Sequence, residues 1–205
     1  VLFRSYLRYS LGGVFYNTNN YANKNSTDQK WHKIQQSFPQ LKLSPWRSQG
    51  DHILLCLQRD GGWSMKGTDL QHWAHNAIQM IRQFSNRPIV VRPHPRVRTD
   101  VAQLITLPGV RESTPGTTLQ QDLSGAWASV FYNSSSSVAA VLAGIPVFAH
   151  DPDCVAWNVA NSNLAQIETP NMPSRESWLY DLAAAHWSDA ESSQGLVYQK
   201  FLQYL

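Results

Sequence analysis

The sequence predicts an α/β fold with an open parallel sheet, and three observations lead to this prediction. Apolar runs of strand length recur along the middle of the chain, as in HILLCL at 52–57 and IPVFA at 145–149. Segments with helical periodicity separate these runs, as the crossovers of a parallel sheet require. The runs are continuously apolar, which is typical of strands buried on both faces, and the loops that follow them are polar.

The first 50 residues differ from the rest and are rich in Asn, Ser and Gln. They hold two short periodic pieces, one near Ser5–Leu11 and one at 28–37, where Asp28 is expected to cap a helix. We therefore expect residues 1–50 to be a short helical or irregular N-terminal arm, with acceptor binding as its candidate role. Residues 51–205 are expected to be a nucleotide-binding type of α/β domain that includes the C-terminal helices.

From residue 52 the expected elements alternate. A strand at His52–Leu57 precedes a helix that Asp69 caps and that ends near Phe84. The inner face of this helix is expected to hold Leu70, Trp73, Ala77, Met80 and Ile81. The later strands are expected at Ile89–Val91, near Val110, at Ala128–Tyr132 and at Ile145–Ala149. Short helices are expected at Asp100–Leu104, Leu119–Leu123 and Val138–Ala143, the last of which is opened by Ser134–Ser137 and stopped by Gly144. Two further helices are expected, one from Ser174 and one over Leu196–Leu205.

Composition places the chain among ordinary globular proteins, with 42% hydrophobic and 15% charged residues. No apolar run is long enough to cross a membrane, and no segment has the pattern of a signal peptide. The two cysteines are too few for a disulfide framework, and Cys56 lies in an expected strand as a reduced core residue. These features predict a cytoplasmic protein without a membrane partner.

The net charge of +3 is unevenly distributed. Residues 51–205 hold ten Lys and Arg against thirteen Asp and Glu, a net −3. The first 50 residues hold one acidic residue, Asp28, against seven basic ones, a net +6: Arg4, Arg8, Lys24, Lys30, Lys33, Lys42 and Arg47. This excess predicts a polyanionic partner on that side, with a merely solvated basic surface as the alternative.

Ligands of open parallel sheets bind at the carboxyl ends of the strands. Four polar loops leave the expected strands at that edge, at residues 58–62, 92–96, 133–137 and 150–153. The run Ser134–Ser137 opens a helix, where free backbone N–H groups and hydroxyls would hold a phosphate. The alternative is that one of these serines simply caps the helix.

His94 lies between two prolines, which fix the loop and aim the imidazole. The flanking Arg92 and Arg96 would lower its pKa if they lie near it, and a bound phosphate would raise it. No cluster of His, Cys or carboxylates with metal-ligand spacing surrounds His94, so we expect no metal site.

Arg59 and Asp60 directly follow the first expected strand. Arg59 is suited to pair with a diphosphate, and Asp60 to act as a general base or to orient a sugar hydroxyl. The loop lacks the glycine patterns of dinucleotide-dependent oxidoreductases and of P-loop NTPases. Asp151 and Asp153, after the last strand, are candidates to contact hydroxyls or to cap a following turn.

These residues together resemble a known family. The stretches VVRPHPR at 90–96, SSSS at 134–137 and LAGIPVF at 142–148 are similar to the Rossmann-like donor domain of GT-B glycosyltransferases, in the capsule-polysaccharide (Kdo-transferase-like) and sialyltransferase branches. The resemblance covers about residues 52–170 and implies that His94 and Ser135–Ser137 contact the donor phosphate. Ala139 stands where many relatives have a ribose-binding glutamate.

The stretches FYNTNN at 15–20 and LQRDGGWSM at 57–65 also resemble small proteins of T4-like phages, which glycosylate hydroxymethylated pyrimidines. If the chain is phage-encoded, its expected location is the host cell cytoplasm. The resemblance implies a metal-independent glycosyltransferase that needs no cofactor beyond a UDP- or CMP-linked sugar and that modifies DNA, for example at 5-hydroxymethylcytosine. One alternative is a glycosyltransferase whose acceptor is a capsule or surface glycan. The other is a module that binds a nucleotide or nucleic acid without catalysis. The candidate catalytic residues are Asp60, His94 and Asp151, the candidate phosphate ligands Arg59, Arg92, His94, Ser134, Ser135, Ser136 and Ser137, and the candidate acceptor contacts Trp63, Lys66 and Arg96.

Overall fold

The computed structural model describes residues 6–96 and 99–204. The chain divides into two compact units. Residues Leu43–Met172 form the first, which we call the sheet unit. The residues up to Lys42 and those from Pro173 onward form the second, which we call the terminal unit.

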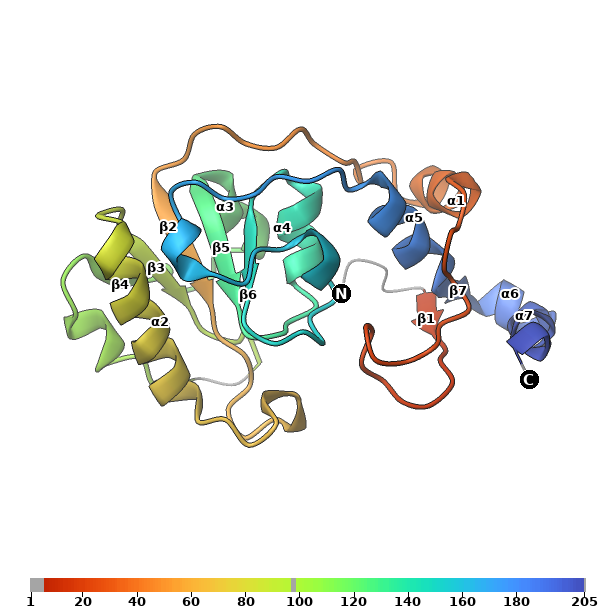
Figure 1. The fold of residues 1–205 in the computed structure, drawn as a ribbon, viewed down its shortest axis with the longest axis horizontal. Coiled ribbons are helices and arrows are strands. Elements are labelled where there is room, and N and C mark those ends of the chain that lie inside the picture. Colours follow the sequence, from red (N-terminus) through yellow and green to blue (C-terminus); the bar gives the residue numbers. More distant parts are fainter. Residues whose placement is uncertain (1–5, 97–98, 205) are drawn as a thin grey trace. The chain divides into compact units, whose positions relative to one another are not determined.

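The sheet unit is built on a five-stranded parallel sheet in the order β4-β3-β2-β5-β6 (Figure 1). Numbered along the chain within the sheet, this is the order 3-2-1-4-5 of Rossmann-like folds, and it reverses between β2 and β5. The predicted α/β class and parallel sheet are thus confirmed. The strands are β2 His52–Cys56, β3 Ile89–Arg92, β4 Val110–Glu112, β5 Ala126–Phe131 and β6 Val147–Ala149.

Strand β2 lies in the middle of the sheet, with Leu54 paired to Val90 of β3 and to Ser129 of β5. The side chains of Ile53 and Leu54 have no exposed area. A strand with neighbours on both edges and covered faces must be apolar on both sides, and this explains the continuous run from which the strand was predicted.

Within the described part of the sheet unit, the α-helices are α2 Leu70–Phe84, α3 Leu119–Ser124 and α4 Ser137–Leu142. The side chain of Asp69 accepts a hydrogen bond from the backbone N–H of His72, so the predicted cap of α2 is confirmed. The predicted inner face of α2 was wrong at Met80, which is 42% exposed. The helix predicted at Asp100–Leu104 is instead a single 3₁₀ turn at Leu104–Thr106.

Residues 43–50 belong to the sheet unit rather than to an N-terminal arm. The backbone N–H of Ser44 donates to the carbonyl of Leu142, and that of Arg47 donates to the carbonyl of Gly144. The Arg47 guanidinium also donates to three carbonyls, those of Leu123, Ser124 and Ala126. These contacts place the boundary between the units near residue 42, not at the predicted residue 50.

The terminal unit joins both ends of the chain. It contains β1 Tyr6–Arg8, α1 Gln29–Ser37, α5 Glu176–Ala184, β7 His186–Ser188, α6 Asp189–Ser193 and α7 Leu196–Phe201. Strand β1 pairs antiparallel with β7, with Leu7 opposite Trp187. The C-terminal helices therefore lie in the same unit as α1, and the piece expected near Ser5–Leu11 contains a strand. Such pairing across the whole chain leaves no trace in local periodicity.

Side-chain contacts reinforce this unit. Asn23 donates to the carbonyl of Asp181 at 2.7 Å, and Glu191 accepts from both Lys30 and Lys33 at 2.5 and 2.8 Å. These two hydrogen bonds, with one from a backbone N–H, outweigh the effect of burial and lower the pKa of Glu191 to about 2. Asp28 precedes α1 as predicted, but its side chain makes no capping hydrogen bond.

Candidate functional site

The carboxyl ends of β2 and β5 flank the point where the strand order reverses, and a buried amide pair joins the loops that follow them. The side-chain oxygen of Gln58 accepts from the backbone N–H of Asn133 at 2.6 Å. The Gln58 amide group donates to the side-chain oxygen of Asn133 at 2.9 Å. Both residues are less than 10% exposed, so this part of the predicted ligand edge is a fixed platform.

The loop from residue 58 to residue 67 is fixed at a second point by Ser64. The Ser64 hydroxyl accepts from Gln58, and the Ser64 carbonyl accepts from the Asn133 side chain at 2.8 Å. Met65 beside it is buried, whereas Trp63 is 68% exposed. The loop thus holds the predicted acceptor contact Trp63 in solvent on an anchored backbone.

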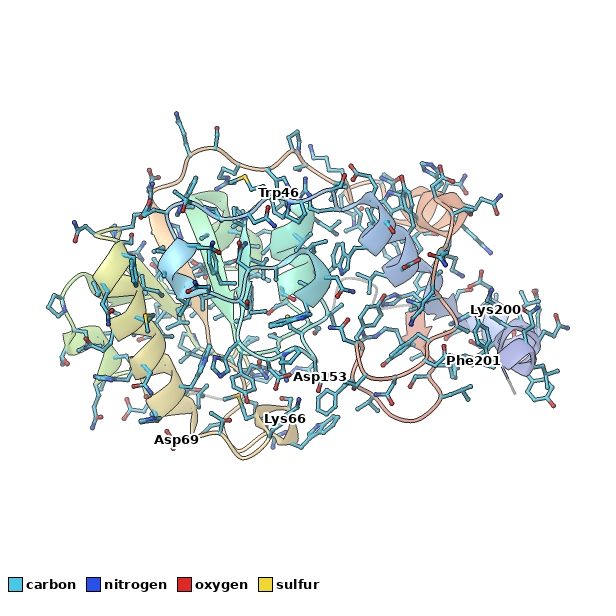
Figure 2. All side chains as sticks on the ribbon, in the orientation of Figure 1. Trp46, Lys66, Asp69, Asp153, Lys200 and Phe201 are labelled. Atoms are coloured by element: carbon cyan, nitrogen blue, oxygen red, sulfur yellow. The ribbon has the colours of Figure 1, made fainter. Side chains whose placement is uncertain are left out.

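Lys66, from the loop between β2 and α2, forms one ion-paired cluster with Asp151 and Asp153 of the loop after β6. Figure 2 shows Lys66 and Asp153 close together. The Lys66 ammonium lies 3.0 Å from a carboxylate oxygen of Asp151 and 2.5 Å from one of Asp153. The hydrogen bonds to Asp153 and Asp151 raise the pKa of Lys66. Both carboxylates are buried, and Oδ1 of Asp153 has no hydrogen-bond partner among the described residues. The residues predicted as an acceptor contact and a catalytic base are therefore bound to each other.

His94 lies in the loop after β3, and its Nδ1 accepts from the backbone N–H of Arg96 at 3.2 Å. Burial, followed by the positive charges of Arg96 and Arg59, lowers the pKa of His94. The ring is therefore neutral at pH 7, with Nδ1 as acceptor and the proton on Nε2. Two of the predicted residues, His94 and Arg96, are thus in contact, and the Nε2 N–H of His94 is left as a donor for a ligand.

Arg92, a predicted phosphate ligand, is engaged within the protein. Its guanidinium forms a salt bridge with Asp122 and donates to the carbonyl of Thr117 at 3.1 Å. Its side chain is 14% exposed. This geometry ties the end of β3 to α3 and does not favour a role in binding phosphate.

The serine run forms a turn before α4. The hydroxyls of Ser134 and Ser136 lie 2.7 Å apart, and Ser135 is exposed. Ser137 is fully buried, and its hydroxyl accepts from the thiol of Cys154. The turn presents three serines and turns the fourth inward, so the prediction that all four contact a ligand does not fit the geometry at Ser137.

The backbone N–H groups of this turn are also less available than predicted. Those of Ser137, Val138 and Ala139 bond to the carbonyls of Ser134, Ser135 and Ser136. The first turn of the helix is thus closed by i to i+3 hydrogen bonds. Binding of an anion here would rest mainly on the serine hydroxyls.

Arg59 and Asp60 are both exposed at the end of β2. The Asp60 carboxylate accepts from the backbone N–H of Gly61 at 2.9 Å. The sequence did not single out Glu112, an exposed carboxylate at the end of β4, opposite Val91 of β3. Glu112 could have been found from the sequence as the polar residue that ends the strand near Val110, because all strands of a parallel sheet have their carboxyl ends at the same edge.

Over residues 6–96 and 99–204, no group of three or more His, Cys, Asp and Glu residues is arranged to hold a metal ion. Within the same ranges, no helix combines the length and apolarity that a membrane span needs. The metal-independent mechanism stays a prediction.

Comparison with known proteins shows a likeness at the level of structure. No protein-family model matches the chain, and no curated protein sequence matches it. Among solved structures, the chain is similar to KpsC of Thermosulfurimonas dismutans, a beta Kdo 2,7 transferase, with a TM-score of 0.62 and 17% sequence identity. The match covers 96% of this chain and 73% of that chain. It confirms the predicted Rossmann-like fold, and the resemblances to GT-B donor domains and to phage proteins stay predictions.

Proposed function

We propose that this protein is a glycosyltransferase that moves a sugar from a UDP- or CMP-linked donor to a hydroxyl group. The observation that carries the proposal is His94 at the carboxyl edge of the sheet, where its Nδ1 accepts from Arg96 and where burial and the charges of Arg96 and Arg59 lower its pKa. This combination of one N–H donor and two cations suits the phosphate of a nucleotide. The fold, shared with a Kdo transferase, agrees with such a donor.

In the proposed reaction the bond from the anomeric carbon to the phosphate oxygen breaks, and a bond from this carbon to the acceptor oxygen forms. Negative charge then develops on the leaving phosphate. The N–H of His94, the Arg59 guanidinium and the hydroxyls of Ser134–Ser136 stabilise this charge. For the ribose hydroxyls we assign Glu112 as the acceptor of hydrogen bonds, because it is an exposed carboxylate at the same edge of the sheet, at the end of β4.

The acceptor hydroxyl loses its proton to a general base, for which we propose Asp60. This carboxylate is exposed at the reversal point and accepts a hydrogen bond from the backbone N–H of Gly61 at 2.9 Å. Asp151 is the weaker candidate because Lys66 holds it in an ion pair and its side chain is 7% exposed. A carboxylate stabilised by a cation is a poorer base.

We propose DNA carrying hydroxymethylated pyrimidines as the acceptor, on the basis of the basic N-terminal residues. Arg8, Lys24 and Lys42 are exposed and available to a polyanion. Arg4 lies outside the described residues. The other cations of this segment are used within the protein: Lys30 and Lys33 pair with Glu191, and Arg47 binds carbonyls. These pairs favour a neutral or surface glycan as the second candidate acceptor.

The test is a transfer assay with purified protein, CMP- and UDP-linked sugars, and either hydroxymethylcytosine DNA or oligosaccharides. Mass spectrometry of the acceptor is the readout, with the His94→Ala variant as control. A sugar-sized mass increase that depends on His94 supports the proposal, and the acceptor that gains it decides between the two candidates. If the folded protein binds the nucleotide but neither transfers the sugar nor hydrolyses the donor, it is a non-catalytic binding module instead.

A further inference from the structure

A pocket of about 400 Å³ opens in the sheet unit between helix α2 and residues 162–164, away from the groups assigned to the phosphate. Val130 of β5 and Phe148 of β6 form part of its floor. After β6 the chain continues through two 3₁₀ turns, Trp157–Val159 and Leu164–Gln166, with no α-helix before α5. The pocket lies beside α2, between that helix and the second of these turns.

One edge of the pocket is a row of exposed side chains on α2. His72, Asn76 and Met80 are spaced four residues apart and therefore lie along one side of the helix. His72 and Asn76 are hydrogen-bonded at 2.9 Å, which fixes the amide against the imidazole. Asn163 lines the pocket from the facing segment and caps the turn that follows it.

Aromatic rings hold His150, which also lines the pocket, in a defined position. The His150 ring lies 5.2 Å from that of Tyr132 at an interplanar angle of 30°. The ring of Trp73, another lining residue, is 6.3 Å from His150 at 66°. The rings of Trp73 and Tyr132 also contact each other, 5.6 Å apart, so the exposed imidazole packs against a fixed aromatic pair and adds polar nitrogen atoms to the pocket wall.

The lining, counted over the described residues, includes no Lys, Arg, Asp or Glu. Because the lining holds no Lys or Arg, a phosphate or a carboxylate would find no permanent countercharge here, and an uncharged ligand fits the pocket better. The floor is apolar, while the edges carry amides, imidazoles and a serine hydroxyl. Planar heterocycles match this distribution because their faces are apolar and their edges carry donors and acceptors.

We propose that this pocket binds an uncharged nucleobase, supplied either by a free nucleoside or by an unpaired base of a nucleic-acid strand. The volume falls at the lower end of the range for small-molecule sites, which suits a base with its sugar. The inference does not rest on the proposed glycosyl transfer, because none of the residues assigned to the phosphate lines the pocket.

The test is binding of four nucleosides, and of a single-stranded oligonucleotide beside an abasic strand of equal length, measured by saturation-transfer NMR and calorimetry. Asn76→Trp fills the pocket from its rim and should weaken binding at least about tenfold, a change of about 1.4 kcal/mol. Gln79→Trp is the matched control, because Gln79 is exposed on the same helix but does not line the pocket. This control should bind within about twofold of the parent protein.

His150→Phe keeps a ring against Tyr132 and removes both ring nitrogens, so it should also weaken binding. Nucleoside binding that Asn76→Trp abolishes supports a free nucleoside as the source. Binding of the base-containing strand alone, lost in the abasic strand, supports a nucleic acid. Absence of saturable binding in both arms, or equal loss in Asn76→Trp and Gln79→Trp, would overturn the proposal. His94→Ala should leave nucleoside binding unchanged, and this separates the proposal from that of the phosphate site.

Discussion

Gln58 and Asn133 hydrogen-bond to each other across the reversal point of the sheet, through one backbone N–H and two side-chain amides. They are 75 residues apart in the chain, and each lies two positions after the last residue of a parallel strand, Gln58 after β2 and Asn133 after β5. The pair makes one platform of two loops that carry predicted ligand-binding residues. Rigid support of this kind keeps side chains positioned for a ligand.

Removing this pair should destabilise the sheet unit. Gln58→Ala deletes the hydrogen bonds to Asn133 and Ser64 and leaves buried polar groups unpaired. We expect the free energy of unfolding to fall by about 2 kcal/mol. Urea unfolding measures this change, with Gln79→Ala as an exposed control. A loss below about 0.5 kcal/mol would show that the pair does not couple the loops.

The assigned tautomer of His94 predicts how different substitutions of this residue change the affinity for nucleotide. Because Nδ1 accepts from Arg96, the ligand should be bound by the N–H at Nε2. Glutamine places its amide nitrogen near that atom and asparagine near Nδ1, so His94→Gln should bind nucleotide more tightly than His94→Asn. Loss of a charge-assisted hydrogen bond predicts about tenfold to hundredfold weaker binding for His94→Ala.

Calorimetry with CMP and UDP measures these affinities, and the matching nucleosides serve as controls that lack the phosphate. Equal affinities of the glutamine and asparagine variants would contradict the assigned tautomer. Since the pKa of His94 is lowered in the free protein, nucleotide affinity should rise as the pH falls through that pKa and the ring gains a charge.

Lys66 should be essential for stability because it neutralises two buried carboxylates. Lys66→Met leaves Asp151 and Asp153 buried without a cation. Breaking a fully buried pair costs about 3 to 5 kcal/mol, but Lys66 is 37% exposed, so we expect about 2 kcal/mol. The double variant Lys66→Met with Asp153→Asn should recover part of this loss. Thermal and urea unfolding provide the measurement, and additive losses would rule out the coupling.

Burial of His186 makes the terminal unit sensitive to acid. Burial lowers its pKa from 6.5 to about 4, and its Nδ1 donates to the carbonyl of Leu182 at 2.7 Å. The folded state therefore resists protonation that the unfolded state accepts. The stabilisation is present above pH 6.5 and is lost as the pH falls toward 4. Between pH 7 and pH 5 the loss should be about 2 kcal/mol.

His186→Asn keeps a donor near Nδ1 and cannot titrate, so its stability should change less over this range. His32→Asn is the control, because the His32 side chain is 61% exposed. Hydrogen exchange of the amides of α5 and β7 measures the terminal unit separately from the sheet unit. The same loss of protection at pH 5 in His186→Asn as in the parent would exclude His186 as the cause.

The sequence was most informative where local pattern determines structure. The run at 52–57 predicted β2 because a central parallel strand must be apolar on both faces, and Asp69 predicted the start of α2 through its cap. The four ligand-edge loops also follow from strand positions alone. Met80 was assigned to the core because its spacing fits the buried face, although it lies at the edge of that face.

What the sequence could not show were pairings between distant residues. Arg92 looked available for a phosphate, yet its partner Asp122 lies 30 positions later. Ser137 resembled its three neighbours, but the helix turns its hydroxyl toward Cys154. The pairing of Lys66 with Asp151 likewise depends on how a loop crosses the sheet edge. Local sequence periodicity does not determine such side-chain pairs, because they depend on tertiary packing.

The contacts of the segment before β2 determine where an expression fragment of the sheet unit should begin. Gly144 has a φ of 74° and lies so close to Pro45 that a Cβ there would collide with the Pro45 carbonyl. A fragment truncated at the apparent domain start, residue 51, would lose Arg47 and expose the carbonyls that it binds. An expression fragment for spectroscopy should therefore begin at Leu43 and end at Met172.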